Sequence, residues 1–230
     1  MKKIPKKYQP KGYDIIYEDV DLIVGNKKPG ALTVAALWNR DSTVHSALNE
    51  YVRKGNPRSN RCVYVVHRLD QATSGILVFA KSEDVQHFLK DNWKTTVKTY
   101  YAIVHGKLEK KSGIIESYLQ EDDDYVVAST DKPGQGKLAQ TEYHVVSETV
   151  KFSLVRINLL TGKKNQIRVH MAELGHPVVG DAKYGKPDTN SKNLCLHSYS
   201  IELTHPHSKK RLKFEVKPPE YFSHLVKFAY

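Results

Sequence analysis

The pattern of apolar and polar residues predicts strands that are grouped together, with a few helices scattered between them. Strand-like apolar runs occur at residues 14–18, 22–24, 63–66, 76–80, about 194–203 and 212–216. Residues 100–161 are almost entirely strand-like, and turn residues break them at 121–124, at 133–136 and around Glu148. Grouped strands favour an α+β fold, with a mixed, largely antiparallel central sheet and flanking helices and loops.

Helical spacing predicts four helices between these strands. The first contains the apolar positions Val44, Ala47, Leu48, Tyr51 and Val52. Asp41 or Ser42 is available as its cap, and Ser82 can cap a second helix, whose first turn is acidic. A third helix is expected from about 165 to 174, with an apolar stripe of Ile167, Met171 and Leu174. A fourth follows Pro218-Pro219.

Composition and length fit one globular domain behind a short basic arm. The chain has 230 residues, of which 40% are hydrophobic and 27% charged, which excludes a disordered chain. No internal repeat and no linker rich in Gly, Ser or Pro divides the sequence. We therefore expect an arm at residues 1–11 and a single domain at 12–230.

The charge points to a polyanionic partner. The chain has 36 Lys and Arg against 25 Asp and Glu, a formal net charge of +11. Five lysines lie in the first eleven residues: Lys2, Lys3, Lys6, Lys7 and Lys11. Nucleic acid is the first expectation and an anionic membrane the second, and the arm's lack of an apolar face disfavours the membrane.

The cysteine content and the start of the chain bear on the compartment. Only Cys62 and Cys195 are present, which predicts no disulfide framework and a reducing environment. The basic start is not followed by the apolar core of a signal peptide, and no stretch has the length of a membrane span. We expect a soluble cytoplasmic protein.

A polar loop between two apolar strands is the first candidate site. Residues 67–75 contain His67, Arg68, Asp70 and two hydroxyl residues. Polar loops on a rigid scaffold often carry catalytic groups, although composition alone favours a turn in which Asp70 or Ser74 binds backbone amides. A kinase catalytic loop is excluded, because the order is His-Arg-Leu-Asp and no glycine-rich phosphate loop or Asp-Phe-Gly is present.

A second polar cluster leads into the third predicted helix. Lys163 and Lys164 lie just before its amino end, where lysines suit a phosphate. Arg168 lies about 100° from the apolar stripe, at the edge of the buried face. It could pair there with a carboxylate from another segment, or it could be a solvated surface arginine.

Histidines and tyrosines give weaker signals. The eleven histidines include His170, His176, His205 and His207, but no metal-binding spacing accompanies them, so we expect no metal. Tyr100 begins a strand after Lys98. A tyrosine at that position is usually a core residue, and it could instead be a platform on which a base stacks.

Five segments together resemble one enzyme family. Residues 67–81 resemble the signature of the RluA-type RNA pseudouridine synthases, His-Arg-Leu-Asp-x-x-Thr-Ser-Gly followed by an apolar strand. Residues 26–30, 98–106, 161–185 and 194–197 are similar to further blocks of that family, in the expected order. The resemblance covers about residues 13–220 and implies the pseudouridine synthase fold. We expect no separate amino-terminal RNA-binding module of the kind that many relatives carry, and the basic arm could partly substitute for it.

The resemblance implies an isomerase, an intramolecular transferase that acts on RNA without a metal or cofactor. Its substrates would be uridines in structured tRNA or rRNA, and no obligatory protein partner is implied, so we expect a monomer. By family position Asp70 is the nucleophile, Arg168 keeps it ionised, and Tyr100 stacks on the uracil and assists removal of the proton on carbon 5. Arg68 would fill the stack that the flipped base vacates, and His67 would orient the loop.

Two departures from the family pattern leave questions open. Lys163 and Asn165 stand where the family usually has arginine and histidine. Lysine keeps the charge that attracts phosphate but loses the bidentate geometry, whereas Asn165 can still cap the helix or form hydrogen bonds. The alternatives to an isomerase are a non-catalytic RNA-binding protein that kept the fold and a metal-dependent RNA hydrolase.

Overall fold

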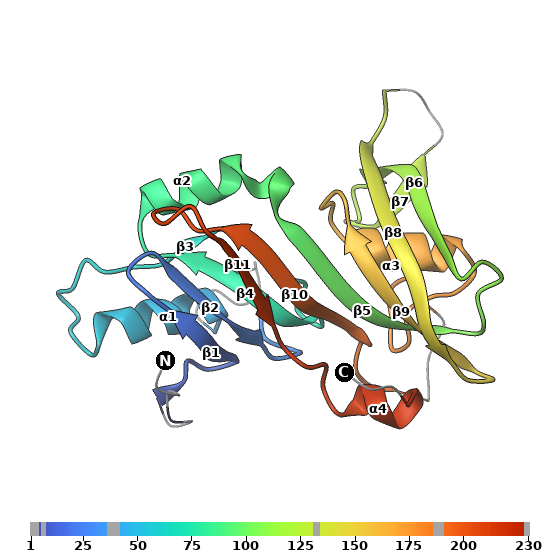
Figure 1. The fold of residues 1–230 in the computed structure, drawn as a ribbon, viewed down its shortest axis with the longest axis horizontal. Helices are drawn as coiled ribbons and strands as arrows, with labels where there is room; N and C mark the ends of the chain where they lie inside the picture. Colours follow the sequence, from blue (N-terminus) through green and yellow to red (C-terminus); the bar gives the residue numbers. More distant parts are fainter. Residues whose placement is uncertain (1–4, 6–7, 36–41, 131–133, 186–190, 228–230) are drawn as a thin grey trace. The chain divides into compact units, whose positions relative to one another are not determined.

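The computed structural model describes residues 5, 8–35, 42–130, 134–185 and 191–227 (Figure 1). The chain divides into two compact units. Unit 1 consists of Met1–Thr96 and Ser200–Val216, and unit 2 of Val97–Tyr199 and Lys217–Tyr230. Both units are built around mostly antiparallel strands with few helices, which confirms the α+β class. None of the helices in the described ranges is long and apolar enough to cross a membrane.

Unit 1 is a sheet covered by two helices. Its elements are β1 (Tyr13–Glu18), β2 (Leu22–Lys27), α1 (Val44–Arg53), β3 (Tyr64–Val65), β4 (Ser74–Ala80), α2 (Glu83–Asp91), a 3-10 turn (Trp93–Thr95), the end of β10 (Leu196–Thr204) and β11 (Arg211–Glu215). The strand order is β1-β2-β4-β10-β11, with β3 also paired to β4. The pairs β1–β2, β2–β4 and β10–β11 are antiparallel.

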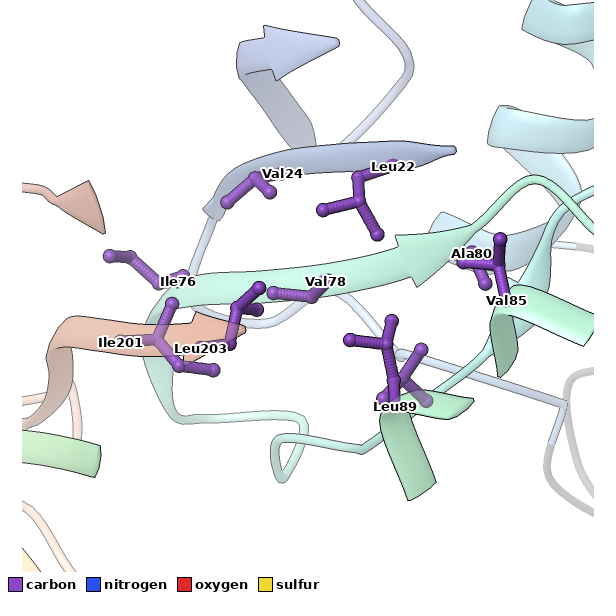
Figure 2. Close-up of a cluster of buried hydrophobic side chains, with 10 residues drawn as sticks. Leu22, Val24, Ile76, Val78, Ala80, Val85, Leu89, Ile201 and Leu203 are labelled. Carbon is purple, nitrogen blue, oxygen red and sulfur yellow. The ribbon is translucent and has the colours of Figure 1, made fainter. Parts of the chain in front are cut away.

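The core of unit 1 forms around β4, in which every residue is buried. On one face, side chains from β2, β4, α2 and β10 pack together (Figure 2) in a cluster of Leu22, Val24, Val66, Ile76, Val78, Ala80, Val85, Leu89, Ile201 and Leu203. On the other face the ring of Phe79 contacts that of Tyr13 edge to face, with 5.9 Å between the ring centroids. It stacks on His45 of α1, with 6.3 Å between the centroids. The apolar run at residues 76–80 of this strand is thus buried from both sides.

The helix ends follow from capping side chains. Thr43, not Ser42, caps α1, because its hydroxyl accepts a hydrogen bond from Ser46 N while the Ser46 hydroxyl accepts one from Thr43 N. Asp41, the other predicted cap, lies outside the described residues. Ser82 caps α2 as predicted, accepting a hydrogen bond from Val85 N.

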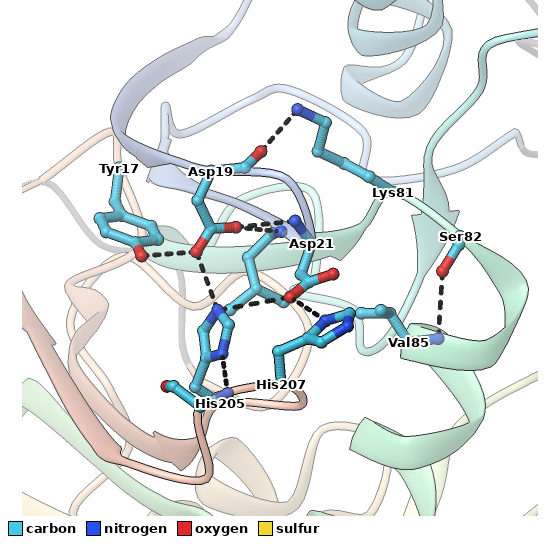
Figure 3. A network of polar contacts seen from close by, with 10 residues as sticks. Tyr17, Asp19, Asp21, Lys81, Ser82, Val85, His205 and His207 are labelled. Carbon is cyan, nitrogen blue, oxygen red and sulfur yellow. Dashed lines mark hydrogen bonds and ion pairs between the residues drawn. The ribbon is translucent and has the colours of Figure 1, made fainter.

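A polar network joins the β1–β2 turn to the β10–β11 turn (Figure 3). Asp19 Oδ1 accepts hydrogen bonds from the backbone of Asp21 and Leu22 at 2.9 and 2.7 Å, which closes the first turn. His205 Nε2 lies 2.8 Å from Asp19 Oδ2, and His207 Nδ1 lies 2.8 Å from Asp21 Oδ2. These two histidines therefore connect segments 186 residues apart in the sequence.

Unit 2 is a longer antiparallel sheet that carries one central helix. Its elements are β5 (Val97–His105), β6 (Ser112–Glu121), β7 (Val127–Thr130), β8 (Lys137–Glu148), β9 (Phe152–Leu159), α3 (Gln166–Glu173), the start of β10 and α4 (Tyr221–Leu225). The strand order is β10-β5-β9-β8-β6-β7. The turns predicted at 121–124 and around Glu148 are confirmed, and the one at 133–136 falls partly outside the described residues.

The helix α3 has a polar buried face as well as an apolar one. Ile167 and Met171 are buried as predicted, but Leu174 is 40% exposed because the helix has already ended at Glu173. Gln166 and His170 are buried in its place. Gln166 Nε2 donates hydrogen bonds to Gln140 O at 3.0 Å and Thr141 Oγ1 at 2.8 Å.

His170 completes the attachment of α3 to the sheet. Its Nδ1 lies 2.9 Å from Thr141 Oγ1, and its Nε2 lies 3.0 Å from Ser117 Oγ, so the imidazole bridges β8 and β6. Burial lowers the pKa of His170, which favours the neutral ring that these two hydroxyl groups can satisfy. Polar contacts therefore hold α3 in a defined orientation, from which Arg168 projects.

Candidate active-site loop and the arginine of the third helix

The loop that carries Asp70 is held by hydrogen bonds on both sides of the aspartate. Thr33 Oγ1 donates to Leu69 O at 2.8 Å and accepts from Leu69 N at 3.3 Å. Gly30 N donates to Gln71 O at 2.8 Å, and Gln71 Nε2 donates back to Gly30 O at 3.1 Å. The backbone before and after Asp70 is thus fixed by the segment that follows β2, while the Asp70 side chain is half-buried.

Lys27 is a buried cation in the same neighbourhood. Its side chain is fully buried, and its Nζ donates to the carbonyl oxygens of Lys28, Ala31 and Gln71 at 3.1, 2.7 and 2.9 Å. Burial lowers the pKa of the Lys27 amine to about 7, against the opposing effect of the Asp70 carboxylate. The sequence analysis assigned no role to this residue, although a lysine ending an apolar strand was a visible signal.

The two residues before Leu69 have different environments. His67 Nε2 accepts a hydrogen bond from Val78 N at 3.1 Å, and its ring centroid lies 4.7 Å from that of Trp93. These contacts attach the start of the loop to unit 1, and the orienting role of His67 stays a prediction. Arg68 is exposed instead, and no partner for its guanidinium occurs among the residues the structure describes.

Arg168 of α3 pairs with a carboxylate from another segment, which was one of the two alternatives predicted for it. Its Nε and Nη2 donate to Asp181 Oδ2 and Oδ1, both at 2.7 Å, in a bidentate pair. Burial alone would raise the pKa of Asp181, but hydrogen bonds and charge from Arg168 outweigh it and lower the pKa. The Arg168 side chain is only 12% exposed, so the prediction of a solvated surface arginine is wrong.

Asn165, one departure from the family pattern, supports the same arginine. Its Oδ1 accepts from Arg168 Nη1 at 3.1 Å, and its Nδ2 donates to Tyr184 OH at 3.0 Å. Its φ of 54° is left-handed, a conformation that asparagine tolerates better than most residues. It makes no capping hydrogen bond through its side chain, so only the predicted hydrogen-bonding role is confirmed.

Lys163 and Lys164 line a hollow of about 500 Å³ together with Lys137. Lys164 forms an ion pair with Glu121, and its Nζ lies 5.2 Å from the centroid of the Tyr125 ring. The Lys163 ammonium has no partner in the ranges that the structure describes. The two predicted phosphate-binding lysines therefore differ, because Lys164 is already paired with the acidic side chain of Glu121 and Lys163 is not.

Tyr100 lies in β5, where it pairs with Ile157 of β9 and is 8% exposed. Tyr100, Lys163, Lys164 and Arg168 all belong to unit 2, whereas Asp70, His67 and Arg68 belong to unit 1. Across the described part of the chain, no group of three or more His, Cys, Asp or Glu side chains could hold a metal ion. The two cysteines are free thiols.

The sequence and the fold of this chain both match known proteins. The family model described as RNA pseudouridylate synthase matches residues 21–173, a segment that includes Asp70, Tyr100 and Arg168. The chain belongs to this family, and it is an isomerase that acts on RNA.

Individual relatives agree with the family match. A Bacillus subtilis protein described as uncharacterized RNA pseudouridine synthase YjbO is 29% identical over 221 residues, which are 95% of this chain and 77% of that protein. The ribosomal large subunit pseudouridine synthase D of Borreliella burgdorferi is 36% identical over 82% of this chain and 60% of that protein. Human RNA Pseudouridylate Synthase Domain Containing 4 has a solved structure with a TM-score of 0.76 and 25% identity, covering 91% of this chain and 90% of that one.

Proposed function

We propose that this protein converts specific uridines of structured RNA, ribosomal or transfer RNA, into pseudouridine, with Asp70 as the nucleophile. The observation that carries this proposal is the aspartate loop, in which Lys27, Gly30 and Thr33 fix the backbone around Asp70. A nucleophile needs this kind of pre-organisation, because its position relative to the reacting carbon decides the rate. The name of the Borreliella relative favours the large-subunit ribosomal RNA as the substrate.

The reaction balances without any other reactant. The bond between uracil N1 and the ribose breaks, a bond between carbon 5 and the ribose forms, and one hydrogen moves from carbon 5 to N1. The Asp70 carboxylate forms a covalent adduct with the base or the sugar and is released when the new bond forms. Tyr100 stacks on the uracil and assists removal of the proton on carbon 5.

Access to the base requires that it leave the helical stack. Flipping costs a few kcal/mol, which a planar cation in the vacated place can offset. The exposed Arg68, two residues before Asp70, supports this role. Arg168 would keep Asp70 ionised. Its guanidinium donates to Asp181 and Asn165, and a cation near Asp70 would favour the charged form of that carboxylate.

The test is Asp70→Asn, which keeps the shape of the side chain and removes the nucleophile. Conversion of uridine in an in vitro transcript of large-subunit ribosomal RNA should fall below detection. RNA affinity should stay the same or rise slightly, because one negative charge facing a polyanion is lost. The matched control is Asp91→Asn, which removes an exposed acid of α2 and should leave both properties unchanged.

Other outcomes would support the alternatives. Full conversion by Asp70→Asn would refute the role of Asp70 as the nucleophile. A wild-type protein that binds the transcripts and converts none would support the alternative of a non-catalytic RNA-binding protein. Strand cleavage that a chelator abolishes would support the hydrolase.

We also propose that the protein acts as a cytoplasmic monomer. Its two free thiols support a reducing compartment, and size-exclusion chromatography with cell fractionation tests the proposal.

A further inference from the structure

Unit 1 contains a hollow of about 610 Å³ beside the Asp70 loop. Its lining comes from four parts of the chain. Lys11 and Gly12 end the basic arm, Gly30 and its neighbours form the turn after β2, and α1 contributes its first two turns. Gln71, the residue after Asp70, completes the lining. The volume lies within the range of roughly 300–1,000 Å³ that is typical of ligand sites.

The hollow is directly connected to the candidate catalytic loop. Gln71 is exposed, and its backbone carbonyl accepts hydrogen bonds from Gly30 N and from the buried Lys27. Its side-chain amide donates to Gly30 O. A ligand that fills the hollow would therefore contact Gln71, the residue that follows Asp70 in the chain.

Small residues and polar groups dominate the lining. A side chain added at Gly30 would meet nothing within 4 Å, and Ala47 of α1, which also lines the hollow, is half-buried. The hydroxyls of Thr43 and Ser46 are already bonded within the cap of α1, so the helix end is not itself an anion site. Such a surface suits a wide, hydrated polymer backbone better than a tightly enclosed small anion.

The lining of the hollow includes one basic and one acidic side chain. Lys11 is exposed at one edge, and it is the last of five lysines in the first eleven residues. Glu50 lies on the α1 side of the lining. The basic arm thus joins unit 1 at an edge of the hollow.

We propose that the sugar–phosphate backbone flanking the target uridine lies in this hollow, between the end of the basic arm and Gln71. The inference rests on the proposed function, since it takes RNA as the partner. In this proposal the RNA strand covers the surface that includes Ala47 of α1. The same RNA strand contacts both the end of the basic arm and the Asp70 loop.

The test places different charges at Ala47, which lies inside α1 and is half-buried. Glutamine, glutamate and lysine have similar lengths and good helix propensities, so the variants differ mainly in charge. The dissociation constant for the large-subunit transcript should rise in the order Ala47→Lys, Ala47→Gln, Ala47→Glu. Each step should be about fivefold at low salt, and the steps should shrink as salt is added, because screening weakens exposed charges.

The matched control is His87 of α2, an exposed residue of the same unit that does not line the hollow. The same three substitutions there should change the dissociation constant by less than twofold. Thermal melts of all six variants confirm folding. Equal affinities for the three Ala47 variants, or an Ala47 series no steeper than the His87 series, would overturn the proposal.

The outcome is separable from that of the proposed function. Conversion of uridine by the wild type tests the enzyme, and the charge order at Ala47 tests the hollow. If the wild type converts uridine and the order is absent, only the hollow is wrong. If the order holds while no transcript is converted, the hollow binds RNA and the proposed activity is wrong.

Discussion

Lys27 and Asp70 show how single residues set the chemistry of the loop. An ammonium group has three N–H donors, and the three carbonyl oxygens around Lys27 can accept all of them. These hydrogen bonds satisfy the donors of the buried ammonium, but they do not replace the hydration that it loses on burial. The pKa of Lys27 is therefore lowered. The Asp70 carboxylate acts in the opposite direction, favouring the charged amine.

The lowered pKa of Lys27 predicts a pH dependence of stability. Between about pH 7 and pH 10.5 the unfolded chain binds a proton that the folded chain does not, so the free energy of unfolding should rise with pH. The contribution is at most about 1.4 kcal/mol per pH unit. The variant Lys27→Met should lack this rise, which urea denaturation at several pH values would measure. Parallel profiles for both proteins would show that the amine stays charged throughout.

A second prediction at this scale concerns Tyr100. The substitution Tyr100→Phe keeps the aromatic face and removes the hydroxyl, so RNA affinity should persist while single-turnover conversion falls at least a hundredfold. Tyr101→Phe, the next residue on β5, is the matched control. Conversion at the wild-type rate in Tyr100→Phe would leave Tyr100 as a stacking residue only.

At the scale of elements, α3 shows what the sequence could and could not predict. Its position and its buried Ile167 and Met171 followed from spacing, whereas spacing left a carboxylate partner for Arg168 as one of two alternatives. Its second buried face did not, because hydrophobic patterns treat Gln166 and His170 as polar and outward-facing. Their burial depends on Thr141 and Ser117, residues of distant strands whose pairing no local pattern reveals.

The same limit applies to the candidate site. The loop of Asp70 was visible as a polar segment between apolar strands, whereas Lys27 and Thr33 hold it from more than thirty residues away. Asp181 was within a quoted family block, but nothing in the spacing distinguished it from a surface acid. Tertiary contacts, rather than local propensity, decide these positions.

The ion pair between Arg168 and Asp181 carries a prediction for this element. Asp181→Asn should lower the free energy of unfolding by about 3 kcal/mol, because it leaves a buried guanidinium without its charge partner. The pKa of Asp181 is lowered in the folded state, so its contribution is present above about pH 4 and is lost as the pH falls through the folded pKa. The variant should therefore show a weaker loss of stability in acid. An acid profile identical to that of the wild type would contradict this account.

At the scale of the whole molecule, net charge and chain topology act together. The formal charge of +11 attracts RNA from a distance, and nearly half of it comes from the arm. Lys2, Lys3, Lys6 and Lys7 lie outside the described residues, while the exposed Lys11 borders the hollow described above. The arm is therefore expected to supply affinity without reading sequence.

Deleting residues 1–11 should weaken RNA binding and flatten its salt dependence. Five lost phosphate contacts would reduce the slope of log affinity against log salt by up to about 4. Single-turnover conversion at saturating RNA should change by less than about twofold. Replacing the five lysines with glutamine in the full-length chain controls for the loss of chain length. A large loss of the rate at saturation would mean that the arm helps to form the active site.

Unit 1 is discontinuous in sequence, and this has a consequence for how the protein is made. Its core needs Ile201 and Leu203 of β10, which the ribosome adds only after all of Val97–Tyr199 has been synthesised. Until then β4 has an unpaired edge and an incomplete apolar face, which favours association with other chains. Completion of the Asp70-bearing unit must therefore wait until β10 has been synthesised, and a nascent chain stalled before Ser200 should be a preferred target for chaperones.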